Sequence, residues 1–425
     1  MPLSLPGTTL VSRLVALLAV AMLLPAANAL ARTHSHRACA QGRRTCRAER
    51  GAVGARRSVH ELGSLSARGS FRELGSDRVG TAAIPSRAPL TARQWQAKEL
   101  HLFSRRSIFN APVSGNVPLD PNSAAIVGNL VQQASTESLG IATTTFGVPI
   151  YIASKTQAPV YVTLDQDPPV PELQNAMSAV PLPPGAQAAA GTDGNLSVYQ
   201  PSTDELWEFW RLHQDSDGSW HATWGGRLVH ASSNPGYYQN MVDSSGNVLE
   251  QWDWGAPATS LALDGGVITI AELEAGTINH ALALGITHTC AGVFAAPAQR
   301  TDGDVVGDPT CVPEGAHFRL NPSINLASLG LPHFTLMLAE AAQRYGIIIN
   351  NRSSGFTFRA EDPTQFETEY GYNPYTGPHN MPGTPGALFD QWPSVLLHAF
   401  PWNDLQLVRM DLRTAPDMAQ VIGTL

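Results

Sequence analysis

Two glutamates stand among tryptophans in the segment ELWEFW at residues 205–210. Its aromatic residues predict a strand over 205–213, and residues three apart on a strand point to opposite faces. Glu205 and Glu208 therefore cannot form a catalytic pair with each other, and Glu208 shares its face with Trp210. A carboxylate beside tryptophans is typical of sugar sites, because aromatic faces stack on sugar rings while acids bond hydroxyls or act as acid or nucleophile. The alternative is an ordinary amphipathic strand.

A glycosidase needs a second carboxylate, at about 5–5.5 Å for retention or about 6.5–9.5 Å for inversion. We expect Glu314 to act with Glu208, because Glu314 lies beside the His- and Arg-bearing segment AHFRL at 316–320. Spacing alone leaves other partners open, namely Glu250, Asp253, Glu361 and Asp362. The aromatic residues expected to contact the sugar are Trp207, Trp210, Trp224, Trp252, Trp254, Tyr372 and Tyr375.

His280 is a second candidate for chemistry, in the segment ITIAELEAGTINHALALGI at 268–286. A histidine base, a tyrosine acid and an arginine or glutamine that neutralises a uronate would serve a polysaccharide lyase. The neighbours that suggest this reaction are Gln299, Arg300, His317 and Arg319. The alternative is a hydrogen-bonded core histidine, because His280 stands among alanine and leucine on a predicted strand over 278–286.

The sequence patterns that are typical of other kinds of functional site are absent. A metal site would need at least two more ligands for His280, and no H-x-x-x-H or H-x-H spacing accompanies it, so no metal is expected. The G-x-S-x-G elbow of serine hydrolases is absent, so a serine hydrolase is disfavoured. Glycine-rich phosphate loops are absent too, and no cofactor is expected.

The elements that must position these residues are mostly short strands. Runs rich in β-branched and aromatic residues are separated by Gly, Pro and Asp turns, without regular strand–helix alternation. This pattern predicts a mainly β fold, an antiparallel β-sandwich or jelly roll with a few peripheral helices. Strands are expected at 147–153, 158–164, 195–200, 205–213, 219–230, 278–286, 292–298, 316–320 and 346–351, and helices at 124–133, 332–346 and 389–400.

The first residues predict export. A short apolar run, LVALLAVAMLLPAANALA, follows Arg13 and ends in a small-residue cleavage pattern, so residues 1–31 are expected to be a secretory signal. A signal-anchor is the alternative. No second apolar run of about 18 residues follows, so we expect a secreted protein without a membrane span after cleavage.

Charge divides the rest of the chain. Residues 32–106 carry fifteen Arg and one Lys against five acids, whereas residues 107–425 carry ten basic residues against thirty acids. The basic segment has few aromatics and is expected to be a disordered leader, either a solvated linker or a tether for polyanions. Residues 107–425 are expected to form the β-sandwich domain. Its acidity disfavours nucleic acid as a partner and favours neutral over acidic polysaccharide.

Four cysteines fall into two local pairs, Cys39 with Cys46 and Cys290 with Cys311. In an exported protein each pair can close a disulfide, although four cysteines allow three connectivities. A Cys290–Cys311 bridge would stabilise its loop by roughly 3 kcal/mol.

Six motifs in order resemble a family of exported bacterial proteins that is frequent in actinobacteria. They are SIFNAPVSGNVPLDPNSA, LWEFW, the segment that holds GTINHALAL, PAQRTDG, PEGAHFRL and AAQRYGIIINN, which together span about 107–412. The resemblance implies a jelly-roll β-sandwich and no particular activity. Under this resemblance, the positions of the family pattern that could carry function are Asn110, Glu208, His280, Arg300, Glu314 and Arg319. Ala296 stands where the family pattern has tryptophan, and Gln299-Arg300 replaces the more common Arg-His.

These patterns together predict a secreted glycan-active protein, a glycosidase on neutral polysaccharide in which Glu208, Glu314 and His280 are catalytic. Arg300 and Arg319 are expected to bind substrate with the aromatic residues. A non-catalytic protein that binds cell-wall glycan and a polysaccharide lyase are the alternatives.

Overall fold

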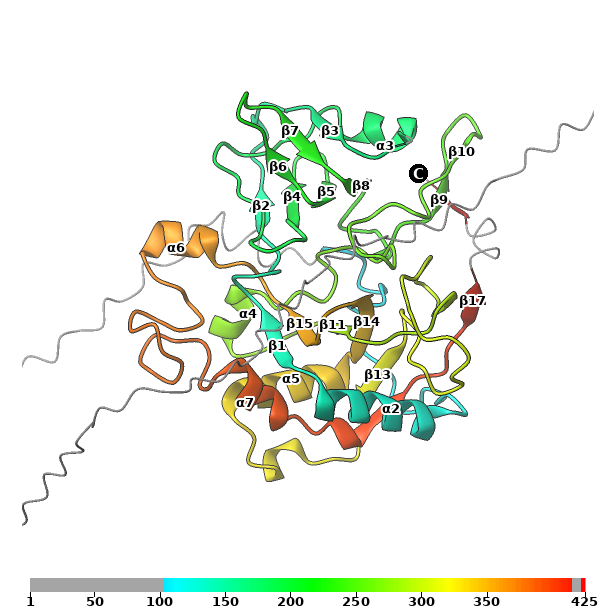
Figure 1. The fold of residues 1–425 in the computed structure, drawn as a ribbon, viewed down its shortest axis with the longest axis vertical. Coiled ribbons are helices and arrows are strands. Elements are labelled where there is room, and N and C mark those ends of the chain that lie inside the picture. The colour runs from blue at the N-terminus through cyan, green and yellow to red at the C-terminus, as the bar shows by residue number, and fades with distance from the viewer. Residues whose placement is uncertain (1–101, 168, 415–421, 425) are drawn as a thin grey trace, which may run out of the picture. The chain divides into compact units, whose positions relative to one another are not determined.

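The structure is a computed structural model that describes residues 102–167, 169–414 and 422–424 (Figure 1). Strands in several sheets dominate these residues, with short helices between them. The prediction of a mainly β fold with a few helices is therefore confirmed. The expected signal at 1–31, the expected leader through residue 101, and Cys39 with Cys46 lie outside the described residues.

A six-stranded sheet lies at the centre of the fold and mixes parallel with antiparallel neighbours. Its order is β1 (Leu139–Ala142), β15 (Phe356–Arg359), β11 (Leu282–Ile286), β14 (Ile347–Arg352), β13 (His317–Leu320) and β16 (Leu405–Leu407). The β1–β15 and β11–β14 pairs are parallel, so the expected antiparallel pairing is wrong for these ladders. The run Ile347-Ile348-Ile349 is apolar on both faces, which is typical of a strand covered on both sides and does not reveal its direction.

Helices cover one face of this sheet: α2 (Ser123–Thr136), α5 (His333–Arg344) and α7 (Pro393–His398) (Figure 1). Their buried side chains pack with the sheet in one core. The expected helix at 332–346 is confirmed as α5, which Gly346 follows with φ +95°, a conformation that glycine adopts without strain. The helix expected at 389–400 is shorter because Pro393 stands in its first turn, where proline's missing N–H costs nothing.

The other face of the sheet meets a second core, built on two smaller sheets. Because residues on a strand alternate between faces, Ile348 points into this second core whereas Ile347 and Ile349 point into the first. One smaller sheet has the order β2 (Ile150–Ile152), β4 (Leu196–Gln200), β5 (Glu205–Trp210) and β8 (Trp224–Leu228), and the other β3 (Val162–Leu164), β7 (Trp220–Ala222) and β6 (His213–Gln214), with α3 (Pro171–Ala176) beside them.

The remaining elements are short. They are β9 (Asn240–Val242), β10 (Val248–Leu249), β12 (Val293–Ala295), β17 (Leu412–Thr414), β18 (Ile422–Thr424), α4 (Ile270–Ala275), α6 (Thr364–Tyr370) and the 3₁₀ turns η1 (Leu326–Ser328) and η2 (Trp402–Asp404). The predicted Cys290–Cys311 disulfide is present. Within the described ranges, no helix has the length and apolar character needed to cross a membrane.

The expected strand at 278–286 begins only at Leu282, so His280 does not share a strand face with Leu282 and Leu284. His280 instead folds back against α4, where its ring contacts Glu272. The apolar run at 278–286 gives no sign of this contact, because Glu272 belongs to another element.

Candidate functional site

A cavity of about 930 Å³ is lined by residues of β2 and β4 in the four-stranded sheet and of the helices α4 and α6. Residues 102–110 and the loop at 184–187 complete its wall. This volume is within the range of about 300–1,000 Å³ that is usual for small-molecule sites. Its lining combines aromatic rings with carboxyl groups, of which Asp264, Glu272, Glu361 and Glu369 are the acids.

Glu272 and His280 form an ion pair in the cavity wall. His280 Nε2 lies 3.0 Å from Glu272 Oε2, and Nδ1 lies 2.8 Å from the carbonyl oxygen of Ala281. Both ring nitrogens thus face acceptors, an arrangement that only the doubly protonated imidazolium satisfies. Burial lowers the pKa of His280, but Glu272 and the carbonyl outweigh it and the net pKa is raised. His280 therefore lacks an available lone pair for work as a general base.

Glu272 also holds the start of α4. It forms a capping box with Thr269, whose backbone N–H and hydroxyl both donate to Glu272 Oε2. Oε1 accepts from the backbone N–H of Asn279 at 3.3 Å. Burial raises the pKa of Glu272, but the charge of His280 and these hydrogen bonds outweigh burial and lower it. Glu272 is therefore an ionised carboxylate whose oxygens are occupied by its own protein.

Asp264 lines the same cavity and is only 8% exposed. Its Oδ1 accepts from the Ser197 hydroxyl at 2.8 Å, whereas Oδ2 has no donor among the described residues. Burial raises the pKa of Asp264 to about 7, against the Ser197 hydrogen bond and the charge of Arg359. A carboxyl with this pKa exchanges its proton near neutrality, which is what general acid–base catalysis requires.

Glu208, the first predicted catalytic residue, lies behind Asp264 and does not line the cavity. It is fully buried on β5 and accepts from the backbone N–H groups of Ala256 at 2.7 Å and Leu263 at 2.8 Å. Burial raises its pKa to about 8, and the charge of Asp264 adds to this rise. Glu208 therefore anchors both ends of the loop that leads into Asp264.

Arg300 holds the same loop from the other side. Its guanidinium donates to the carbonyl oxygens of Gly255 and Pro257 and to the hydroxyl of Ser260. Ser260 has φ +60°, a conformation that is costly for a residue with a side chain. Two of the residues predicted to touch substrate, Glu208 and Arg300, are thus brought together as supports of the loop at 255–263.

Glu314 and Arg319 lie elsewhere and do not line the cavity. Glu314 is fully buried, and its Oε2 accepts from the backbone N–H of Asp302 at 3.2 Å. Burial and the charge of Asp302 raise the pKa of Glu314 to about 8. Arg319 ties β13 to the carbonyl oxygens of Ser114 and Gly115.

The aromatic residues predicted to contact sugar are mostly inside the protein. Four of them are buried: Trp207, Trp224, Trp254 and Tyr375. Trp207 donates to the carbonyl oxygen of Ala176, and Tyr375 donates to that of Glu361. Trp210, Trp252 and Tyr372 are half-buried, and none of the seven predicted aromatic residues lines the cavity.

The cavity has its own aromatic residues, which sequence reasoning missed. They are Phe103, Phe109, Tyr151, Tyr199, Phe366 and Tyr370. They come from four separate parts of the chain, so no local pattern could have grouped them. Glu272 carried a usable signal, because Thr269 and Glu272 form the T-x-x-E pattern of a capping box. Asp264 carried no such signal in the sequence, since its raised pKa depends on burial in the tertiary structure.

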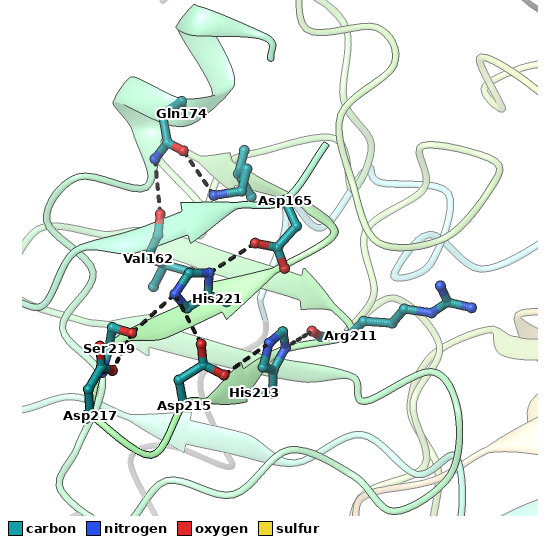
Figure 2. A network of polar contacts seen from close by, with 10 residues as sticks. Val162, Asp165, Gln174, Arg211, His213, Asp215, Asp217, Ser219 and His221 are labelled. Atoms are coloured by element: carbon teal, nitrogen blue, oxygen red, sulfur yellow. Dashed lines mark hydrogen bonds and ion pairs between the residues drawn. The ribbon is translucent and has the colours of Figure 1, made fainter. Parts of the chain in front are cut away.

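A second polar network lies on the three-stranded sheet, outside the cavity. Figure 2 shows His221 between Asp165 and Asp215, with His213 on the far side of Asp215. His221 Nδ1 lies 2.9 Å from Asp165 Oδ1, while both contacts of Asp215 are longer, at 3.7 Å. Hydrogen bonding to Asp165 raises the pKa of His221. Within the described ranges, no three or more His, Cys, Asp or Glu side chains are placed to hold a metal ion.

Comparison with known proteins finds no family model, no curated protein and no solved structure that matches this chain.

Proposed function

We propose that this protein binds a glycan without carboxylate groups in the cavity and hydrolyses a glycosidic bond there, with Asp264 as the general acid. One observation carries the proposal: a cavity of about 930 Å³ combines aromatic rings with carboxyls, one of which has a pKa raised to about 7. Glycosidases use an acid with a raised pKa together with a second carboxylate.

Glu361 and Glu369 are the carboxyls that can take the second role. Both line the cavity, whereas Glu272 is occupied by His280 and by the start of α4. Glu361 is 8% exposed and accepts from the backbone N–H of Ile270, whereas Glu369 is exposed at the rim. The separation from Asp264 decides between retention and inversion.

The charge of the lining supports a non-acidic substrate. Four carboxyls and one histidine line the cavity, and no lysine or arginine is found among its described residues. A uronate would meet net repulsion there, and His280 has no available base nitrogen for β-elimination. These two observations disfavour the lyase alternative.

We further propose that the protein works outside the cytoplasm and that its sheets form a jelly-roll sandwich. The Cys290–Cys311 disulfide supports the first point, because such bridges persist in oxidising compartments. The antiparallel β4–β5–β8 ladder, whose strands bury most of their side chains, supports the second.

The test is release of reducing sugar from β-glucan, xylan, mannan, chitosan and polygalacturonate. Wild-type protein and Glu340→Gln, an exposed change on α5 away from the cavity, should release sugar from a non-acidic polymer. Asp264→Asn should lose this activity with a melting temperature no lower than that of wild type, because asparagine does not ionise in this buried position. Binding without release would leave the non-catalytic glycan-binding alternative, and unsaturated products from polygalacturonate would refute hydrolysis in favour of a lyase.

A further inference from the structure

Three side chains on the three-stranded sheet meet in the geometry of a nucleophile, a base and an orienting acid (Figure 2). Ser219 Oγ lies 3.1 Å from His221 Nε2, and His221 Nδ1 lies 2.9 Å from Asp165 Oδ1. Both distances are within the reach of about 2.6–3.2 Å that proton transfer in such a set requires. None of the three residues lines the cavity, so they form a separate group.

The sheet brings these residues to one face. Ser219 directly precedes β7 and His221 lies within it, so the two side chains point to the same side of the strand. Asp165 follows β3, which pairs in parallel with β7. Gln174 on α3 holds β3 by two hydrogen bonds to its backbone (Figure 2). The paired strands therefore fix the three residues relative to one another.

The charges around His221 suit a base that must carry a proton briefly. Hydrogen bonding to Asp165 raises the pKa of His221 and outweighs burial, which lowers it. In the neutral ring Nδ1 donates to this carboxylate, and the lone pair of Nε2 is directed at the serine. The other ionisable groups that face the ring are Asp215 and Asp217 in the adjoining turn, and His213, whose ring stacks on it at 5.6 Å. The acids stabilise the imidazolium that forms during the reaction.

Asp217 restrains the serine when no substrate is bound. Its Oδ1 accepts from the hydroxyl of Ser219 at 2.7 Å and from the backbone N–H of the same residue at 2.9 Å. Asp217 is exposed in the turn, so an incoming substrate can displace its carboxylate. This displacement frees the hydroxyl for His221 and the backbone N–H for the oxygen that becomes negative in the transition state.

We propose that Ser219, His221 and Asp165 form an esterase site for neutral O-acyl esters, such as O-acetyl groups. The site is independent of the cavity and of the glycan hydrolysis proposed there. A G-x-S-x-G elbow is not required, because unrelated folds build this set of residues on different elements. The site is open, with 23% of the His221 side chain and 40% of the Asp165 side chain exposed, so the ester can belong to a large molecule. The carboxylates of Asp215 and Asp217 beside it disfavour an anionic ester.

The reaction proceeds by acyl transfer through the serine. Ser219 Oγ forms a bond to the acyl carbon, the π pair of the carbonyl moves to its oxygen, and His221 Nε2 takes the hydroxyl proton. The carbonyl then re-forms, the bond from the acyl carbon to the alcohol oxygen breaks, and Nε2 returns the proton to the alcohol. Water releases the acid from the acyl-serine by the same two proton transfers. Asp165 is a positioning residue, because it holds the Nδ1 side of the ring and touches no reacting atom.

The experiment measures hydrolysis of p-nitrophenyl acetate by the full chain from pH 5 to pH 9, and maps the residue that a fluorophosphonate labels. We expect the label on Ser219 and a rate that rises with pH as His221 loses its proton. Ser219→Ala and His221→Gln should each lower the rate by about 10²-fold or more. Asp165→Asn should lower the rate and move its rise to lower pH, because it removes the group that raises the His221 pKa. Asp217→Ala should increase both the rate and the labelling, which loss of a purely structural contact would not do.

His288→Gln is the matched control for ester cleavage by a surface histidine. His288 Nδ1 lies 3.1 Å from Asp304 Oδ2, but no hydroxyl among the described residues bonds its other ring nitrogen. This variant should keep the wild-type rate. An unchanged rate in Ser219→Ala, or an equal loss in His288→Gln, would show that histidines alone cleave the ester and would overturn the proposal. Failure of the fluorophosphonate to label Ser219 in the wild type overturns it without reliance on the folding of any variant.

Discussion

Replacing Glu208 by glutamine should remove much of the pH dependence of this protein's stability between pH 5 and pH 8. The folded-state pKa of Glu208 is raised from 4.5 to about 8, chiefly by burial. Between these two values the folded state holds a proton that the unfolded state has lost. The free energy of unfolding therefore falls as pH rises through this window, and the loss is complete above the folded-state pKa.

The size of this pH dependence follows from the difference between the folded-state and unfolded-state pKa values of Glu208. Each pKa unit corresponds to about 1.4 kcal/mol, so the rise in the Glu208 pKa corresponds to a loss of about 3–5 kcal/mol between pH 5 and pH 8. Glutamine does not ionise, but it offers one acceptor where Glu208 serves both Ala256 and Leu263. The unmatched backbone N–H costs about 1–3 kcal/mol at every pH. The variant should therefore be less stable than wild type at pH 5 and as stable or more stable at pH 8.

The assay is denaturant unfolding followed by tryptophan fluorescence at pH 5, 6, 7 and 8. The raised pKa values of Asp264, His280 and Glu314 contribute in the same direction in both proteins, so their contributions largely cancel when the two stabilities are subtracted. A constant difference between wild type and variant across this range would refute the proposed burial of a neutral carboxyl. A free energy of unfolding of the wild type that rises from pH 5 to pH 8 would refute the predicted direction of the pH dependence.

Three further changes test the supports of the site. Glu272→Gln should lower the free energy of unfolding by about 1–3 kcal/mol at pH 6, because it leaves the His280 cation without its counter-charge; equal melting temperatures would contradict the ion pair. Arg300→Lys should cost about 1–3 kcal/mol in urea unfolding, since one ammonium cannot match the three acceptors of the guanidinium; a loss under about 0.5 kcal/mol would argue against this loop support. Reduction of Cys290–Cys311, whose partners are 21 residues apart, should lower stability by roughly 3 kcal/mol, and a melting temperature insensitive to reductant would contradict the expectation.

The structure also explains why Glu208 and Arg300 looked functional in the sequence. A polar residue inside an apolar segment indicates a role that needs its side chain. That role can be to hold a loop by hydrogen bonds or to act on a substrate. Here both hold the loop at 255–263, whose next residue is Asp264 in the cavity wall. Tertiary packing made this difference, because it buried Glu208 completely and left Asp264 at the cavity.

Local signals in the sequence determined the strand-rich character of the domain, the α5 helix that ends before Gly346, and the disulfide between neighbouring cysteines. Each depends on residues close together in the chain, where side-chain pattern and turn chemistry act directly. The tertiary structure alone decided the parallel β11–β14 ladder, the burial of Trp207, and the meeting of Asp264 with the distant residues of α6. These features depend on which distant segments share a core and on which polar groups lose their water, and neither is encoded within any single stretch of sequence.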